Sequence, residues 1–180
     1  TAYRKAIEYA PLLAYPWAGL GDSYASTGRD LDAINAYQKA IELNKDFITP
    51  WLHLADIYCR QGRNRDAIKT YKRALAVNPK NHQIWNELGS AFLKFKAFEE
   101  AMYAFLKSIE LDRSFGWAYS NLALAYAYQG KYLDAIEACQ KSLQVFTEDG
   151  DKITAWDRLA NFYRAINDYD SAIQAYQMAD

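Results

Sequence analysis

An eight-residue pattern that recurs along the chain is the feature that most constrains its fold. In each copy an aromatic residue is followed by Leu at the fourth position, a small residue at the fifth and another aromatic at the eighth. The copies are WAGLGDSY from Trp17, WLHLADIY from Trp51, WNELGSAF from Trp85, YSNLALAY from Tyr119 and WDRLANFY from Trp156. Their starts are 34, 34, 34 and 37 residues apart (51−17, 85−51, 119−85, 156−119). Self-similarity at such a period is the signature of a repeat architecture, in which stacked units bury one continuous core.

Each copy of the pattern predicts two helices joined by a short turn, because apolar residues recur at helical spacing in both halves of the repeat. Gly28, Gly62 and Gly130 supply the residue that a turn after a helix needs, and Lys96 and Asn167 replace it elsewhere. No strand is predicted. The predicted helices cover residues 1–13, 15–27, 31–43, 49–61, 65–77, 83–95, 99–111, 117–129, 133–146, 153–166 and 169–178.

Small residues at fixed positions indicate where the two helices of a pair cross closely. Gly21 and Gly89 occupy this position in two first helices, where Ala stands in the other copies. A second column on the partner helices consists of Ala33, Ala67, Ala101, Ala135 and Ala172. Each pair therefore has an apolar face that only a neighbouring pair can bury.

Composition and charge exclude several classes of function. Hydrophobic residues make up 51% of the chain and charged residues 24%, which is typical of a globular protein. The net charge of −1 gives no electrostatic reason for binding nucleic acid. No apolar run reaches the roughly 18 residues that a membrane helix requires. Cys59 and Cys139 form no short motif, so a reducing, cytoplasmic location is predicted.

The recurring set Trp17, Leu20, Gly21, Tyr24, Ala33, Tyr37 and Ala40 resembles the tetratricopeptide repeat. The resemblance covers essentially the whole chain. It implies an all-α fold, a right-handed α-α superhelix of about five helix pairs plus a leading single helix, in one domain over residues 1–180. The implied units are residues 1–13 from a preceding repeat, full repeats 14–47, 48–81, 82–115 and 116–149, and a truncated repeat 153–180. The chain is expected to be a piece of a longer protein, since it starts within a helical pattern.

Catalytic and metal-binding chemistry has little support. His53 and His82 are the only histidines, no Ser or Cys nucleophile has a visible base, and no phosphate-binding Gly-rich loop occurs. The stretch EDGD at residues 148–151 lacks the full calcium-loop pattern. A solvated turn, in which Asp151 caps the next helix, is therefore predicted in preference to a metal site. The sequence therefore predicts no enzyme, no cofactor and no metal.

The resemblance implies that the first helix of each pair lines a concave groove, so the variable positions of these helices are candidate peptide-binding residues. These are His53, Asp56, Asn86, Glu87, Leu93, Trp117, Asn121, Leu124, Tyr128, Arg158, Asn161 and Arg164. Acidic residues stand in the earlier repeats, and Arg158 and Arg164 stand in the last. The groove is therefore predicted to change from acidic to basic.

Trp117 lies outside the repeating Trp column, two residues before Tyr119. With Leu93 and Leu124 it would form an exposed apolar patch, and an indole buried against a partner contributes on the order of 2 kcal/mol. Alternatively, Trp117 packs between neighbouring helices as part of the core. The sequence leaves both readings open.

One ligand class of the family can be compared residue by residue. Chaperone-binding tetratricopeptide domains hold a C-terminal carboxylate with two Lys, two Asn and one Arg. The matching positions here are Asn86, Ser90, Asn121, Thr154 and Arg158. Only Asn121 and Arg158 agree and both lysines are absent, so heat-shock chaperone tails are disfavoured. Asn121, Asn161 and Arg158 remain available for a peptide backbone or a carboxylate.

The leading hypothesis is a non-enzymatic scaffold that binds an extended peptide or a partner helix in its groove. The alternative is a self-association module, a homo-oligomer formed by end-to-end stacking of exposed terminal faces. A third hypothesis makes the chain a regulatory segment of a larger enzyme or signalling protein.

Overall fold

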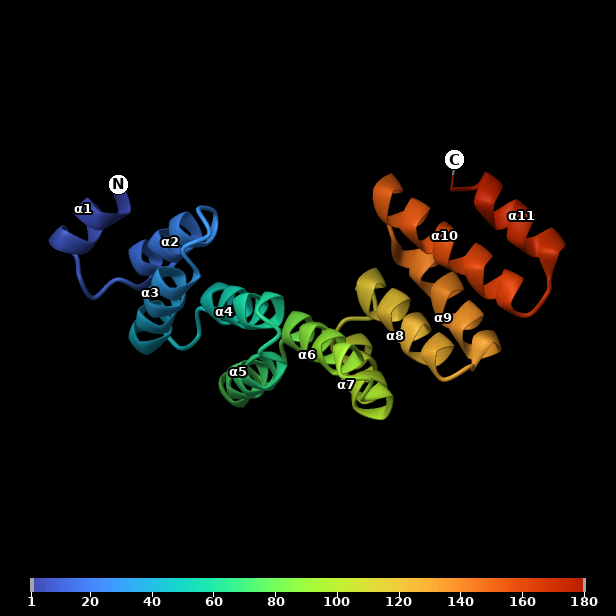
Figure 1. The fold of residues 1–180 in the computed structure, drawn as a ribbon, viewed down its shortest axis with the longest axis horizontal. Coiled ribbons are helices and arrows are strands. Elements are labelled where there is room, and N and C mark those ends of the chain that lie inside the picture. Colours follow the sequence, from blue (N-terminus) through green and yellow to red (C-terminus); the bar gives the residue numbers. More distant parts are fainter. Residues whose placement is uncertain (1, 180) are drawn as a thin grey trace. The chain divides into compact units, whose positions relative to one another are not determined.

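The computed structural model describes residues 2–179 and contains, within that range, eleven helices and no strand (Figure 1). They are α1 Ala2–Tyr9, α2 Ala14–Ala25, α3 Asp30–Leu43, α4 Ile48–Arg60, α5 Asn64–Val77, α6 His82–Lys94, α7 Phe98–Leu111, α8 Gly116–Tyr128, α9 Tyr132–Val145, α10 Asp149–Ala165 and α11 Tyr169–Gln177. The all-α class is confirmed. The predicted bounds of α2 to α9 and of α11 agree with the structure to within two residues at either end.

Two helices differ from the predictions at one end. Helix α1 ends at Tyr9 rather than at residue 13, because Pro11 has no N–H to continue it. Helix α10 begins at Asp149, four residues before the predicted start (153−149). Glu148 is its N-cap residue without a capping side-chain bond, so the prediction that Asp151 caps this helix is wrong. Asp149 and Asp151 instead lie in the first turn, where negative charge is favourable.

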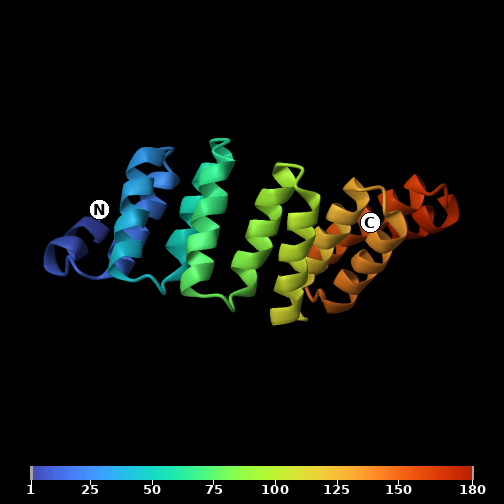
Figure 2. The same cartoon turned by 90° about the horizontal axis from the view of Figure 1, so that it is seen from below.

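The chain divides into two compact units, Thr1–Lys80 with α1 to α5 and Asn81–Asp180 with α6 to α11. Within unit 1, α2 packs on α3 and α4 packs on α5, and within unit 2 the pairs are α6 with α7, α8 with α9 and α10 with α11 (Figures 1 and 2). A single domain over the whole chain stays a prediction. The predicted outer boundaries at residues 1 and 180 lie outside the described residues.

The close crossing of paired helices depends on glycine in two of the pairs. A Cβ atom on Gly21 would lie 2.5 Å from the ring of Tyr37, and one on Gly89 would lie 2.6 Å from the ring of Phe105. Both rings are almost completely buried, at 2% exposure for Tyr37 and 0% for Phe105. An aromatic side chain of the second helix therefore fills the space that the glycine of the first helix leaves open.

Each repeated tryptophan of unit 1 is bonded to the turn that precedes its own helix. The indole Nε1 of Trp17 donates to the carbonyl of Pro11 at 3.1 Å, and that of Trp51 donates to the carbonyl of Lys45 at 2.9 Å. This bond holds the start of a helix pair against the preceding turn. The repeated Trp residues of unit 1 therefore have a structural role.

Candidate functional site

Two classes of site find no support in the described part of the chain. Among residues 2–179, no group of three or more His, Cys, Asp and Glu side chains is arranged to hold a metal ion. No helix in the same range has the length and apolar character needed to cross a membrane. The cytoplasmic location and the lack of nucleic-acid binding stay predictions. The candidate residues are therefore considered as a surface for another protein.

Arg158 of α10 is the most unusual charged side chain of unit 2. Its Nη1 donates to the carbonyl oxygen of Ser120 at 3.1 Å and to the Ser120 hydroxyl at 2.6 Å. The guanidinium carbon lies 6.0 Å from the ring centroid of Trp117. Burial lowers the pKa of Arg158, since the charged form loses part of its water. No carboxylate of residues 2–179 pairs with this cation.

Trp117 lies between the core and the surface. Its ring meets the buried ring of Phe146 edge to face, at 5.3 Å between centroids and 68° between planes. The side chain remains partly exposed, and Leu93 and Leu124 are also partly buried against the same apolar cluster. The structure thus gives Trp117 a packing contact and leaves part of the indole accessible. Its role in binding stays a prediction.

Three polar residues of α6 and α8 form a directed chain of hydrogen bonds. Asn121 Nδ2 donates to Asn86 Oδ1 at 3.0 Å, and Asn86 Nδ2 donates to Glu87 Oε1 at 3.0 Å. Asn86 is only 3% exposed, so it orients Asn121 and is not itself open to a ligand. Asn121 consequently directs its amide N–H₂ inward and keeps its oxygen as an acceptor.

The other candidates of unit 2 lie near the ends of α8 and α10. Asn161 donates to the Asp157 carbonyl at 2.8 Å and accepts from the Tyr176 hydroxyl at 3.0 Å. Tyr128 is 64% exposed and stacks on Phe98. Arg164 is exposed in the last turn of α10 and forms no ion pair with residues 2–179. Arg164 is therefore a second cation of this helix available to a partner.

The candidates of unit 1 form a separate cluster. Asp22 Oδ1 accepts from the Tyr37 hydroxyl at 2.7 Å and lies 2.9 Å from Nδ1 of His53. Burial, together with the bond to Asp22, raises the pKa of Tyr37. Asp56 pairs with Arg60 at 3.2 Å, and a pocket of about 280 Å³ adjoins these residues.

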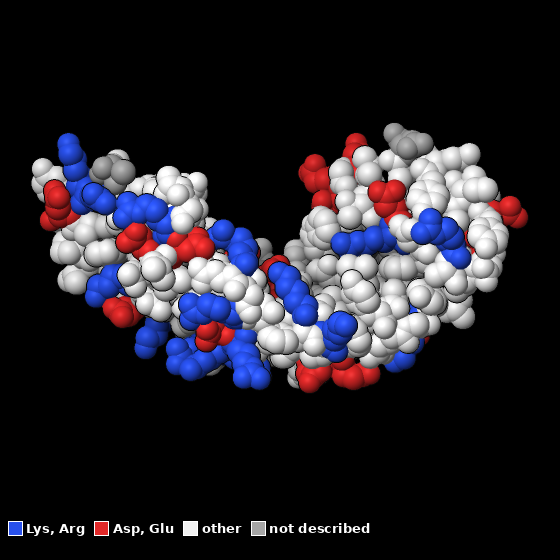
Figure 3. Space-filling model, viewed as in Figure 1, with Lys and Arg blue, Asp and Glu red and all other residues white. Residues whose placement is uncertain are grey.

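The acidic side chains of unit 1 are thus partly compensated by neighbouring bases, and Figure 3 shows acidic and basic atoms interspersed over this unit. Sequence reasoning missed Arg60, although its place one helical turn after Asp56 was a usable signal. The predicted change from acidic to basic along one groove concerns both units together and stays a prediction.

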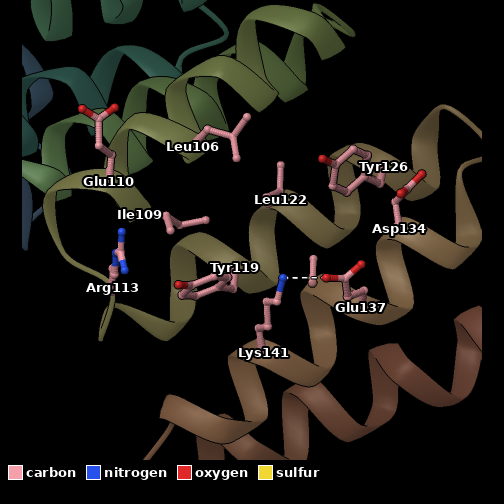
Figure 4. Close-up of a pocket in the computed structure, with 11 residues that line it drawn as sticks. Leu106, Ile109, Glu110, Arg113, Tyr119, Leu122, Tyr126, Asp134, Glu137 and Lys141 are labelled. Carbon is pink, nitrogen blue, oxygen red and sulfur yellow. Dashed lines mark hydrogen bonds and ion pairs between the residues drawn. The ribbon is translucent and has the colours of Figure 1, made fainter.

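A further pocket of unit 2 was not predicted from the sequence. It has a volume of about 500 Å³ and lies between α7 and α9 over a floor formed by α8 (Figure 4). Leu106, Ile109 and Leu122 give it apolar walls and floor, and charged side chains surround them. The signal in the sequence was Leu106, since the equivalent residues 34 positions away are Lys72 and Gln140 (106−34, 106+34).

Comparison with known families gives two matches. A model described as the cilia and flagella-associated protein 70 C-terminal domain matches residues 2–153, and a tetratricopeptide repeat model matches residues 155–179. The chain is also 35% identical over 88 residues to a curated relative, the protein STIP1 homolog of Dictyostelium discoideum. That match covers 47% of this chain and only 16% of the relative.

Solved structures with the same fold include MamA, at 26% identity and a TM-score of 0.75, covering 89% of this chain and 92% of that chain. A chain of the APC/C hetero-tetramer Cut9–Hcn1 has 19% identity and a TM-score of 0.81, covering 98% of this chain and 35% of that chain. YrrB, described as a TPR protein with an unusual peptide-binding site, has 20% identity and a TM-score of 0.71, covering 99% of this chain and 91% of that chain. Since the first family model spans most of the sequence, the chain belongs to the family of the cilia and flagella-associated protein 70 C-terminal domain, within the tetratricopeptide repeat proteins.

Proposed function

We propose that this chain is a non-enzymatic protein-interaction scaffold whose unit 2 binds an extended peptide or a partner helix along α6, α8 and α10. Membership of the tetratricopeptide repeat proteins supports the scaffold role. The observation that carries the peptide site is Arg158, a partly buried cation without an anionic partner among residues 2–179. The family description, a protein associated with cilia and flagella, supports a place within a larger assembly.

The hydrogen bonds of Arg158 leave donors available for a ligand. Both bonds to Ser120 use Nη1, so Nη2 and Nε–H remain to donate. A guanidinium that has lost part of its hydration gains most from a carboxylate, which accepts two parallel hydrogen bonds from it. The favoured ligand group is therefore a carboxylate, either a chain terminus or an Asp or Glu side chain.

Two neighbours of Arg158 support an extended peptide beside that carboxylate. The exposed part of Trp117 offers an apolar surface next to the cation, because the guanidinium lies over its ring. The Asn121 oxygen is oriented as an acceptor through Asn86 and suits a peptide N–H group. Together they specify a segment with a carboxylate, a large apolar side chain and an accessible backbone.

Substitution of the two central residues is expected to weaken peptide binding while the fold is retained. Arg158→Gln and Trp117→Ala should each raise the Kd at least about tenfold, since a partly buried Arg or Trp at an interface contributes roughly 2 kcal/mol or more. Peptides selected from a random library against the parent chain provide the probe, and isothermal titration calorimetry gives the Kd.

The matched control is Lys107→Gln, which removes a partly exposed cation of α7 whose ion-pair partner among residues 2–179 is Glu110. Its Kd should equal that of the parent chain. Unchanged affinity in both Arg158→Gln and Trp117→Ala would show that the groove assignment is wrong. Circular dichroism of each variant separates a loss of binding from a loss of structure.

Self-association is the second candidate, and exposed apolar side chains on α11 and at its C-cap residue favour it. Tyr169 is 59% exposed, Ile173 57% and Met178 60%. A stacking face of this kind on one copy would be covered by a complementary face on another. Light scattering is then expected to show a mass that rises with protein concentration, and Ile173→Asp should abolish that rise. A constant monomer mass over the same range would contradict this candidate.

A further inference from the structure

In the first full repeat, an arginine of the chain itself covers the aromatic residue next to the turn. The guanidinium of Arg29 lies 4.5 Å from the ring centroid of Tyr24. The same group pairs with Asp32, with Nε to Oδ2 at 2.7 Å. Tyr24, Arg29 and Asp32 thus form a corner in which one cation contacts a ring and a carboxylate.

The second full repeat builds the same corner from the equivalent residues. Arg63 lies 4.4 Å from the ring centroid of Tyr58, and its Nε donates to Asp66 at 2.8 Å. The backbone angles of the two arginines agree, with φ −88° and ψ 61° at Arg29 and φ −82° and ψ 51° at Arg63. The corner is therefore a recurring element of this repeat.

The fourth repeat keeps the ring and the carboxylate of this corner and lacks the arginine. Tyr126 and Asp134 stand 68 residues after Tyr58 and Asp66 (126−58, 134−66), and Lys131 stands in the place of Arg63 (131−63). Lys131 has the same backbone conformation, with φ −84° and ψ 65°. Among residues 2–179, no cation lies over the Tyr126 ring or pairs with Asp134, and Lys131 forms neither contact.

This unfilled corner opens into the pocket of about 500 Å³ between α7 and α9. Figure 4 shows Tyr126 of α8 and Asp134 of α9 near one another at one end of the pocket. Leu106 of α7 lines the same pocket and is 48% exposed. The equivalent residue of the next repeat, Gln140, instead donates to the hydroxyl of Tyr163 at 3.1 Å. The pocket thus combines the unfilled corner with the apolar side chain of Leu106, whereas the equivalent positions of the neighbouring repeats hold Lys72 and Gln140.

The charges around Tyr126 favour a cation there. Burial raises the pKa of Tyr126, and the carboxylates of Asp134 and Glu137 raise it further, while Lys141 acts against them. Glu137 is already compensated by Lys141, whose Nζ lies 2.6 Å from its carboxylate. Asp134 has no such partner among the described residues, so its charge is available to an incoming group.

We propose that the pocket between α7 and α9 binds an arginine of a protein partner. The guanidinium stacks on Tyr126 and pairs with Asp134, as Arg29 and Arg63 do at the equivalent corners of unit 1. A large apolar side chain next to that arginine in the partner contacts Leu106 and Leu122. Arginine is favoured over lysine because its planar, weakly hydrated group both stacks on a ring and binds a carboxylate with two bonds. This site is separate from the one centred on Arg158.

The test uses two capped dipeptides, acetyl-Leu-Arg-amide and acetyl-Leu-Gln-amide, titrated into the whole chain and followed by NMR. Saturable shifts of the Tyr126 ring and the Leu106 methyl groups are expected with the arginine peptide and not with the glutamine peptide. Asp134→Asn should raise the Kd of the arginine peptide by about three- to tenfold, the range expected for a charge pair combined with a cation–π contact.

Lys131→Arg is the sharper variant, because it restores the residue that fills the corner in unit 1 and disturbs no packing. It should remove the saturable shifts of Tyr126 while circular dichroism is unchanged. The control Lys39→Arg, at an exposed lysine of α3 paired with Glu42, should bind the peptide as the parent does. Equal shifts with both dipeptides, or unchanged binding in both Lys131→Arg and Asp134→Asn, would overturn the proposal. So would concentration-dependent shifts at Tyr126 and Leu106 without peptide, which would assign the pocket to a second copy of the chain.

Discussion

Replacing Phe105 with Ala is expected to lower the free energy of unfolding by about 3–5 kcal/mol, the range for removing a buried Phe side chain. Phe105 of α7 is 0% exposed and lies against Gly89 of α6. Because Gly89 has no side chain to move into the space, the cavity left by the ring would persist. The loss should therefore fall at the upper end of this range.

Urea denaturation followed by circular dichroism measures the effect, with Leu106→Ala as the matched control on the same helix. Leu106 is 48% exposed, so its truncation should cost less than about 1 kcal/mol, in proportion to the apolar area that it buries. Hydrogen exchange would show whether the protection lost in Phe105→Ala belongs to α6 and α7. Equal transition midpoints for the two variants would contradict the packing role of Phe105.

Gly21→Val is expected to destabilise unit 1 by about 2–3 kcal/mol, the size of an overpacked core position. The added Cβ would lie 2.5 Å from the Tyr37 ring, far inside contact distance. That ring is fixed by its hydroxyl bond to Asp22 and by edge contact with His53, so it has little freedom to withdraw. The helices α2 and α3 must separate instead.

Gly150→Ala serves as the comparison, because a Cβ on Gly150 would meet nothing within 4 Å. This residue lies in the first turn of α10, and Ala there should raise stability by up to about 1 kcal/mol through its helix propensity. Thermal unfolding measures both changes, and the melting temperature should fall for Gly21→Val and rise for Gly150→Ala. A Gly21→Val protein as stable as the parent would mean that α2 and α3 do not need the close approach.

The helices were predictable because their causes are local and repeated. Apolar and small columns at a fixed period locate a helix pair wherever the period holds. The start of α10 was missed where three extra residues break the period near Gly150. Acidic residues suit both a solvated turn and the first turn of a helix, so the sequence alone did not distinguish the two.

The positions of the candidate side chains were less predictable, because burial depends on neighbours far along the chain. Asn86 and Asn121 have the same chemistry and both lie on first helices, yet Asn86 is 3% exposed while Asn121 reaches over it. Arg158 acquires its environment from Ser120, which is 38 residues away in the sequence. A periodic pattern identifies which face of a helix is variable and does not identify which of its residues a neighbouring helix covers.

The bonds of Trp17 and Trp51 bear on how an array of this kind can change its length. Each indole bonds to a carbonyl only six residues earlier. The donor and the acceptor are therefore encoded within one gene segment that specifies 34 residues. A tandem duplication of that length copies the bond intact, and a deletion of the same length removes it whole. Neither event leaves one of these indole N–H groups without its acceptor. Helix pairs built like those of Trp17 and Trp51 can therefore be gained or lost during evolution with this bond kept intact.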